Sequence, residues 1–128
     1  AKLDRIQAIK GWVENGQTKQ LVRDVVCSDG RAPDTAGKCS ATSASVDLTT
    51  CVADKDIGAS TLATMFHDPD YDPSQWAFYY VRVLENPSCR WTTTLANSVG
   101  TEPPADVPKT EQQRGWSSPI WVSSSKSQ

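Results

Sequence analysis

Long apolar runs and clusters of basic residues are both missing from this sequence. No apolar segment approaches the roughly 20 residues that cross a bilayer as a helix, so no membrane span is expected. The chain carries 13 basic and 15 acidic residues, for a formal net charge of −2. Nucleic-acid binding needs clustered lysines and arginines that neutralise phosphates, so we expect no nucleic-acid partner.

Catalytic motifs are equally scarce. A glycine-rich phosphate loop, a G-x-S-x-G elbow and an H-E-x-x-H pair are all absent. His67 is the only histidine, and a surface position at a strand end explains it better than catalysis does. Asp68, Asp70 and Asp72 alternate like the first ligands of a calcium loop, but the glycine of such a loop would fall on Pro73. An Asp-Pro turn is the favoured interpretation, and we expect no catalytic residue, metal or cofactor in this chain.

Four cysteines, Cys27, Cys39, Cys51 and Cys89, are spaced at least twelve residues apart. An even number in a small domain favours two disulfides formed in an oxidising compartment, whereas zinc sites use closer pairs. Unpaired buried thiols are the alternative. We favour Cys27–Cys39 and Cys51–Cys89, because the first pair would close a loop rich in Gly, Pro and Asp. This interpretation predicts a periplasmic or extracellular protein.

The β signals are strongest in three segments. Residues 5–13 and 17–26 are rich in β formers and flank Asn15-Gly16, the strongest short hairpin signal. Residues 76–84 are aromatic and β-branched almost throughout.

The remaining segments are expected to be loops and shorter strands. Residues 28–45 and 95–113 are predicted as long loops, 60–67 as a strand, and 115–122 as a closing strand interrupted at Pro119. The predicted fold is an all-β, antiparallel, immunoglobulin-like β-sandwich with long disulfide-tied loops.

By length the chain forms one domain, which we place at residues 1–122, followed by a flexible tail at 123–128. The sequence has no signal peptide and opens within a structured segment. We therefore expect it to be a mature segment or a fragment of a longer protein.

Five tryptophans are many for 128 residues. Trp12, Trp76 and Trp121 are assigned to the core or its border. The other two each lie beside or near an arginine at the border of a long loop. A guanidinium can hold a carboxylate or a phosphate at two points, although a stacked structural arginine is the commoner arrangement. The candidate ligand or interface residues are therefore Arg90, Trp91, Arg114 and Trp116.

A family resemblance extends over nearly the whole chain. It rests on six stretches in order, which are Asp4-Arg5-Ile6-Gln7 with Lys10-Gly11-Trp12, Ile57-Gly58-Ala59 with Leu62-Ala63-Thr64, Asp68 to Pro73, Ala77 to Glu85, Pro87 with Arg90-Trp91, and Gln112 with Arg114 and Trp116 to Trp121. With these motifs the chain resembles the C-terminal end of a large bacterial family. That family is a domain of unknown function related to the PHP-type (polymerase and histidinol phosphatase) metal-dependent phosphoesterases.

The resemblance implies a non-catalytic C-terminal β-sandwich domain of an exported metallohydrolase-like protein of unknown substrate. Its partner would be the catalytic portion of the same protein, where His, Asp and Glu side chains would hold a divalent metal. With one histidine and no H-x-H, this chain matches none of those ligands, so nothing catalytic is carried over. The chain also departs from the family pattern in its four cysteines and in Gln113 and Gly115, where an acidic residue and alanine are more usual.

Two other functions stay open on the sequence alone. One is a ligand- or partner-binding module that uses the Trp and Arg side chains at positions 90, 91, 114 and 116. The other is a small hydrolase that uses His67 with the three carboxylates that follow it.

Overall fold

The computed structural model describes residues 1–124, and the fold begins with a long hairpin. β1 (Leu3–Glu14) pairs antiparallel with β2 (Gln17–Cys27). Asn15 and Gly16 have φ angles of 50° and 74°. Such positive values at both central residues define a two-residue hairpin turn, because its twist matches that of the strands. The predicted hairpin is confirmed.

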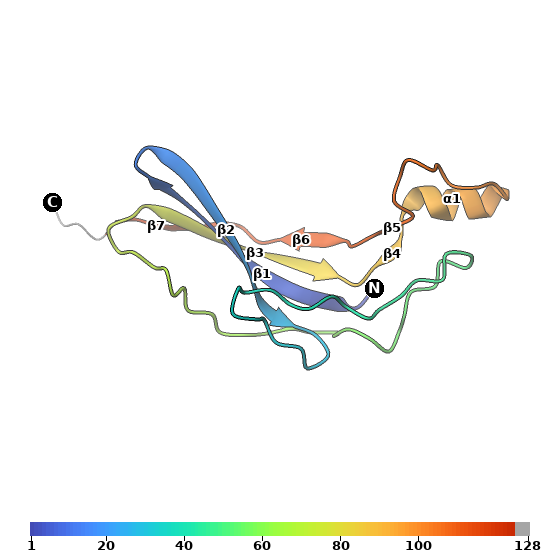
Figure 1. The fold of residues 1–128 in the computed structure, drawn as a ribbon, viewed down its shortest axis with the longest axis horizontal. Helices are drawn as coiled ribbons and strands as arrows, with labels where there is room; N and C mark the ends of the chain where they lie inside the picture. Colours follow the sequence, from blue (N-terminus) through green and yellow to red (C-terminus); the bar gives the residue numbers. More distant parts are fainter. Residues whose placement is uncertain (125–128) are drawn as a thin grey trace.

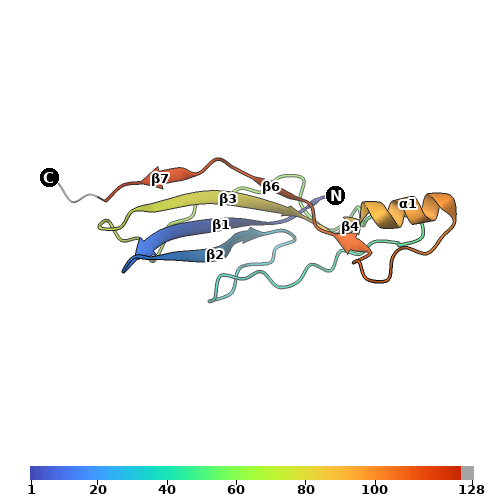
Figure 2. The ribbon, with the colours of Figure 1, turned by 90° about the horizontal axis from the view of Figure 1, so that it is seen from above.

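The main sheet is completed by three further strands. β3 (Ala77–Glu85) pairs with β1, and its other edge carries both β6 (Arg114–Trp116) and β7 (Ile120–Val122). The order β2-β1-β3-β6, with β7 also on β3, is seen face-on in Figure 2. The predicted interruption of the closing strand at Pro119 is therefore observed. Ser117 bridges the gap, because its backbone N–H donates to Val81 O and its hydroxyl accepts from Val81 N–H, both at 2.9 Å.

A helix stands where the sequence predicted the start of a loop. The two-stranded sheet of β4 (Ser88–Cys89) and β5 (Thr110–Glu111) leads into α1 (Trp91–Val99). Consecutive threonines lower helix propensity, and no side chain caps the first turn, so the usual start signals were missing. The end signal was present in Gly100, which has a φ of 71° and closes the helix in the left-handed conformation.

A long coil from the end of β2 to the start of β3 passes beneath the main sheet (Figure 1). Disulfides Cys27–Cys39 and Cys51–Cys89 attach it, so the predicted pairing is confirmed. The strand predicted at 60–67 is wrong. That segment is coil, preceded only by an isolated bridge between Leu3 and Ala59. It passes over a face of the sheet, where side chains make contact but no backbone edge is offered for pairing.

The apolar core is small for a chain of this size. The buried hydrophobic residues are Ile9, Cys27, Ala77, Leu84 and Ala96. The chain exposes 8438 Å² of surface. This is about 1,700 Å² more than the surface expected for a compact monomer of 14.0 kDa.

Buried polar contacts supplement this core. Asp4 is fully buried and accepts hydrogen bonds from Arg31 at 2.6 Å and Gln112 at 3.0 Å, and it also contacts Arg5. These partners come from the coil, β1 and the segment after β5, so one carboxylate ties distant parts of the chain together.

The architecture as a whole is mostly strand, with antiparallel sheets, one short helix and two disulfides. It is consistent with the all-β sandwich that the sequence predicts. Within residues 1–124, no helix is long and apolar enough to cross a membrane. Part of the predicted flexible tail, Ser125–Gln128, lies outside the described residues.

Candidate functional site

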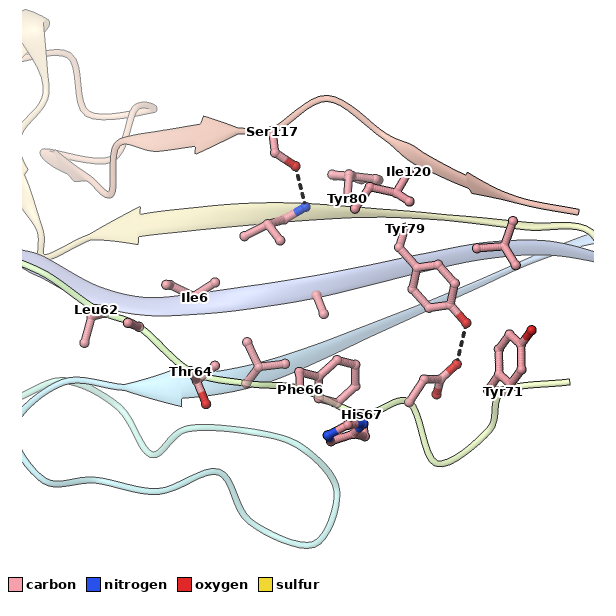
Figure 3. Close-up of a pocket in the computed structure, with 16 residues that line it drawn as sticks. Ile6, Leu62, Thr64, Phe66, His67, Tyr71, Tyr79, Tyr80, Ser117 and Ile120 are labelled. Carbon is pink, nitrogen blue, oxygen red and sulfur yellow. Dashed lines mark hydrogen bonds between the residues drawn. The ribbon is translucent and has the colours of Figure 1, made fainter. Parts of the chain in front are cut away.

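A large hollow lies between the main sheet and the coil beneath it (Figure 3). This groove of about 750 Å³ is lined mainly by apolar side chains from β1, β3, β7 and the coil. Figure 3 shows Leu62, Phe66 and Tyr71 of the coil facing the strands. The groove therefore marks where the coil packs on the sheet, and we call this side of the sheet the covered face.

The polar centre of the covered face is Asp68. Its Oδ2 accepts hydrogen bonds from Lys10 Nζ at 2.8 Å and from the Tyr79 hydroxyl at 2.6 Å, the latter drawn in Figure 3. Lys10 Nζ also donates to the Asp70 carbonyl at 2.6 Å. Its ammonium lies 5.7 Å from the centre of the Tyr79 ring. The Asp68 and Lys10 side chains are only 10% and 7% exposed. These contacts attach the turn at residues 68–70 to β1 and β3.

The protonation states of this centre oppose a role in proton transfer. Burial disfavours ionisation of Asp68, but the hydrogen bonds from Lys10 and Tyr79 outweigh it and hold the Asp68 pKa below 3.8. Burial, followed by the hydrogen bond to Asp68, raises the pKa of Tyr79 far above its ordinary value. Neither group changes charge near neutral pH, as a general acid or base there would need to.

The aspartates and the histidine of the hydrolase hypothesis are not gathered into one site. His67 is exposed, as the sequence predicted, and Asp70 pairs with Arg23 at 2.5 Å. Asp72 accepts from the backbone and hydroxyl of Ser74, which confirms the predicted turn. Among residues 1–124, no group of three or more His, Cys, Asp or Glu side chains could hold a metal ion.

The opposite side of the sheet, which we call the open face, carries rows of side chains across the strands. Residues alternate between faces along a strand, so Phe78, Tyr80 and Arg82 of β3 share this face. Directly paired residues lie on the same face, which places Trp121 beside Phe78 and Trp116 beside Arg82. Trp116 and Trp121 are therefore both on the open face.

One of these rows is held together by hydrogen bonds. Gln7 Nε2 donates to Asp24 Oδ1 at 2.6 Å, and Arg82 Nε donates to Gln7 Oε1 at 2.7 Å. Gln7 and Asp24 are buried. The row fixes the Arg82 side chain next to Trp116, which is exposed at the edge of the sheet. Arg114, two residues before Trp116 on β6, is exposed on the same face.

The hairpin end of the open face is aromatic. The Trp121 and Phe78 ring centres are 5.2 Å apart, with an angle of 50° between the ring planes. Trp121 is 72% exposed and Trp76 is 66% exposed, so their predicted place in the core is wrong. Trp12, half-buried on the covered face, fits the predicted border of the core. The strand pattern could not show that coil residues 62–71 pack on the face opposite Trp76 and Trp121.

Arg90 and Trp91 lie at the other end of the molecule, where α1 begins. Arg90 is half-buried at the N-cap position, and its Nη1 is 4.0 Å from Glu111 Oε2. Trp91 is 65% exposed. The structure therefore distributes the four candidate residues as two pairs on two elements, Arg90 and Trp91 on α1, and Arg114 and Trp116 on β6.

The sequence reasoning missed the rest of the surface around Trp91. Leu95 and Val99 follow it at successive four-residue steps and are 54% and 63% exposed. Residues four apart lie on one side of a helix, so the three form an apolar stripe, which we call the α1 stripe. The buried residues of α1 are Thr93 and Ala96. A helix assignment for 91–99 would have revealed the stripe, and Gly100 was its only sequence signal.

Comparison with known proteins places this chain in a family. The model of a family described as "Protein of unknown function (DUF3604)" matches residues 1–124. No curated protein and no solved structure matches the chain. Because the family match spans nearly the whole sequence, the chain belongs to the DUF3604 family of proteins of unknown function.

Proposed function

We propose that this chain is a non-catalytic C-terminal β-sandwich domain of a larger, exported metallohydrolase-like protein. In this proposal it packs against the catalytic portion of the same protein through the α1 stripe and through the β6 edge of the open face. The family resemblance in the sequence motivates the metallohydrolase part of the proposal. The two disulfides support export, since such bonds persist in oxidising compartments.

The observation that carries the proposal is that the large apolar side chains of α1 are exposed, while smaller side chains of the helix are buried. An amphipathic surface helix normally turns its apolar side toward its own core. Here Thr93 and Ala96 are buried, while Trp91, Leu95 and Val99 face outward. Contiguous exposed apolar surface of this kind marks a protein–protein contact.

The exposed area and its composition support the same conclusion. An excess of about 1,700 Å² is about twice what one partner contributes to a standard interface, which suits a permanent contact. Tryptophan and arginine are enriched among the residues that dominate interface energies. Trp91, Arg114 and Trp116 supply these residue types around α1 and β6.

The divalent metal of such a protein would lie in its catalytic portion. The described part of this chain brings together no set of metal ligands. Its largely buried ion pair between Lys10 and Asp68 anchors a turn. We therefore assign no catalytic step to this chain, although Arg90 and Arg114 could approach a neighbouring active site from the docked surface.

A second candidate function is the binding of a separate molecule by some of the same side chains. Arg114 and Trp116 are exposed together on the open face, which suits a binding module for an independent ligand or partner. The two candidates differ in where the partner is encoded. A metal-binding portion in the coding sequence upstream of Ala1 supports the first, and its absence would favour the second.

The decisive experiment compares Leu95→Gln with a matched control, Ser98→Gln. Both positions are exposed on α1, but only Leu95 belongs to the α1 stripe. The catalytic portion and this chain would be produced as two polypeptides, and their association measured by size-exclusion chromatography and calorimetry. We expect Leu95→Gln to weaken association at least about tenfold and Ser98→Gln, which removes no apolar group, to weaken it clearly less.

Two results would overturn this proposal. One is unchanged association for Leu95→Gln, with equal hydrogen exchange of α1 in the isolated chain and in the assembled protein. The other is tight binding of a divalent metal by the isolated chain together with hydrolysis of a phosphoester.

A further inference from the structure

A second groove lies on the open face, at the hairpin end of the sheet and away from α1. It has a volume of about 610 Å³. Figure 1 shows the tip of the β1–β2 hairpin rising above β3 and β7. The lining residues on this face are Gly11, Val13, Thr18, Gln20, Trp76, Phe78 and Trp121.

The floor of this groove is a broad aromatic surface. A Cβ atom at Gly11 would collide with the Phe78 ring, so glycine is what allows that ring to lie against the backbone of β1. Trp121 leans on Phe78 from the edge strand β7, with 5.2 Å between ring centres. Trp76, immediately before β3, adds a third ring to the lining. Two indoles are thus available to a ligand from solvent.

The polar groups of the groove are neutral and have no hydrogen-bond partners among residues 1–124. Gln20 pairs with Gly11 and Thr18 pairs with Val13, which places both side chains on the open face. No side-chain hydrogen bond within the described residues engages either of them. Lys19 also borders the groove, but it pairs with Trp12 and its side chain belongs to the covered face.

We propose that this groove binds a neutral pyranose sugar, as one unit of an oligosaccharide. The C–H face of a pyranose ring is flat and apolar and can stack on an indole, while its hydroxyls lie around the rim. The Gln20 amide and the Thr18 hydroxyl can both donate to and accept from such hydroxyls. Among residues 1–124, no cationic side chain lies on this face of the groove to hold a phosphate or a carboxylate. This proposal is independent of the proposed docking function, which uses the other end of the molecule.

The test is titration of the protein with four hexasaccharides, followed by calorimetry and saturation-transfer NMR. The probes are cellohexaose, xylohexaose and N-acetylchitohexaose, with hexagalacturonate as the anionic probe. We expect at least one neutral probe to bind with a Kd below about 10 mM and hexagalacturonate to bind more weakly. Trp76→Ala and Trp121→Ala should each weaken binding about tenfold.

The matched control is Trp91→Ala, which removes an equally exposed indole outside the groove and should leave binding unchanged. Gln20→Ala provides a variant that spares the aromatic floor, and it should weaken binding about threefold. Circular dichroism would verify the fold of each variant. The proposal is overturned if no neutral probe binds, or if binding is unchanged in Gln20→Ala and in both groove tryptophan variants.

Discussion

Side chains on the two faces of the main sheet differ in the contacts that they make within the chain. On the covered face the coil supplies partners, and Lys10, Asp68 and Tyr79 form a closed set of contacts. On the open face the Phe78 ring contacts Trp121 and the backbone of β1, and Trp116 and Trp121 are exposed. The polar side chains at the centre of the covered face therefore have partners within the chain, whereas the open face presents two indoles to solvent. Our proposals place the functional contacts on the open face.

The largest expected effect comes from detaching the coil that forms the covered face. Replacing Cys51 and Cys89 together with serine should lower the free energy of unfolding by about 4 kcal/mol, since the bond closes a loop of 38 residues. The pair Cys27 and Cys39 closes 12 residues and should cost about 3 kcal/mol. Urea denaturation measures both losses. Equal stability with and without the bonds would mean that the coil is held by packing alone.

Asp68→Asn tests the contacts by which Asp68 attaches the coil to the covered face. The amide loses the charge that Lys10 and Tyr79 bind, so the free energy of unfolding should fall by about 2 kcal/mol. Asp70→Asn is the matched control, because its 59% exposed carboxylate pairs with Arg23 near solvent and should contribute less than about 0.5 kcal/mol. Thermal and urea unfolding of the two variants would settle the comparison. Equal losses would show that burial does not distinguish these two carboxylates.

The stability that the Asp68 contacts contribute should also depend on pH. The Asp68 pKa is lower in the folded protein than its ordinary value of 3.8, so ionised Asp68 stabilises the fold above that pH. This contribution is lost as the pH falls through the folded-state pKa. The difference in melting temperature between the wild type and Asp68→Asn should therefore be constant near neutral pH and shrink below about pH 3.8. A difference that grows on acidification would contradict this linkage.

The smallest effect on stability is expected on the open face. Trp116→Ala should change the free energy of unfolding by less than about 0.5 kcal/mol, because the indole is exposed. Trp12→Ala, half-buried on the covered face, should cost about 1 to 3 kcal/mol. Calorimetry of the two variants compares the faces with one residue type. Similar costs would mean that the open face already contributes to the core.

Local signals in the sequence were enough to predict much of the fold. Asn15-Gly16 determined the hairpin, because few residues tolerate two successive positive φ angles. The aromatic and β-branched run at 76–84 identified β3, and the loop composition between Cys27 and Cys39 indicated the disulfide pairing.

The predictions that proved wrong all concern which parts of the chain pack against each other. Residues 60–67 have β-forming composition but pass across the sheet as coil, and composition does not reveal that path. The sequence pattern placed Trp76 and Trp121 in the core or at its border. Both are exposed, because coil residues 62–71 pack on the opposite face of the sheet. The candidate residues at 90, 91, 114 and 116 are at least partly accessible, and their role in binding stays a prediction.

The attachment of α1 has a consequence for how fast a partner could bind. The Asn97 amide donates to the carbonyls of Leu48 at 2.7 Å and Thr49 at 3.0 Å, and the Cys51–Cys89 disulfide ends one residue before the N-cap. The helix is thus held before any partner arrives, although its apolar side faces water. Association through it requires little loss of conformational entropy. Its rate should then be set by diffusion and orientation, and its specificity by the lifetime of the complex.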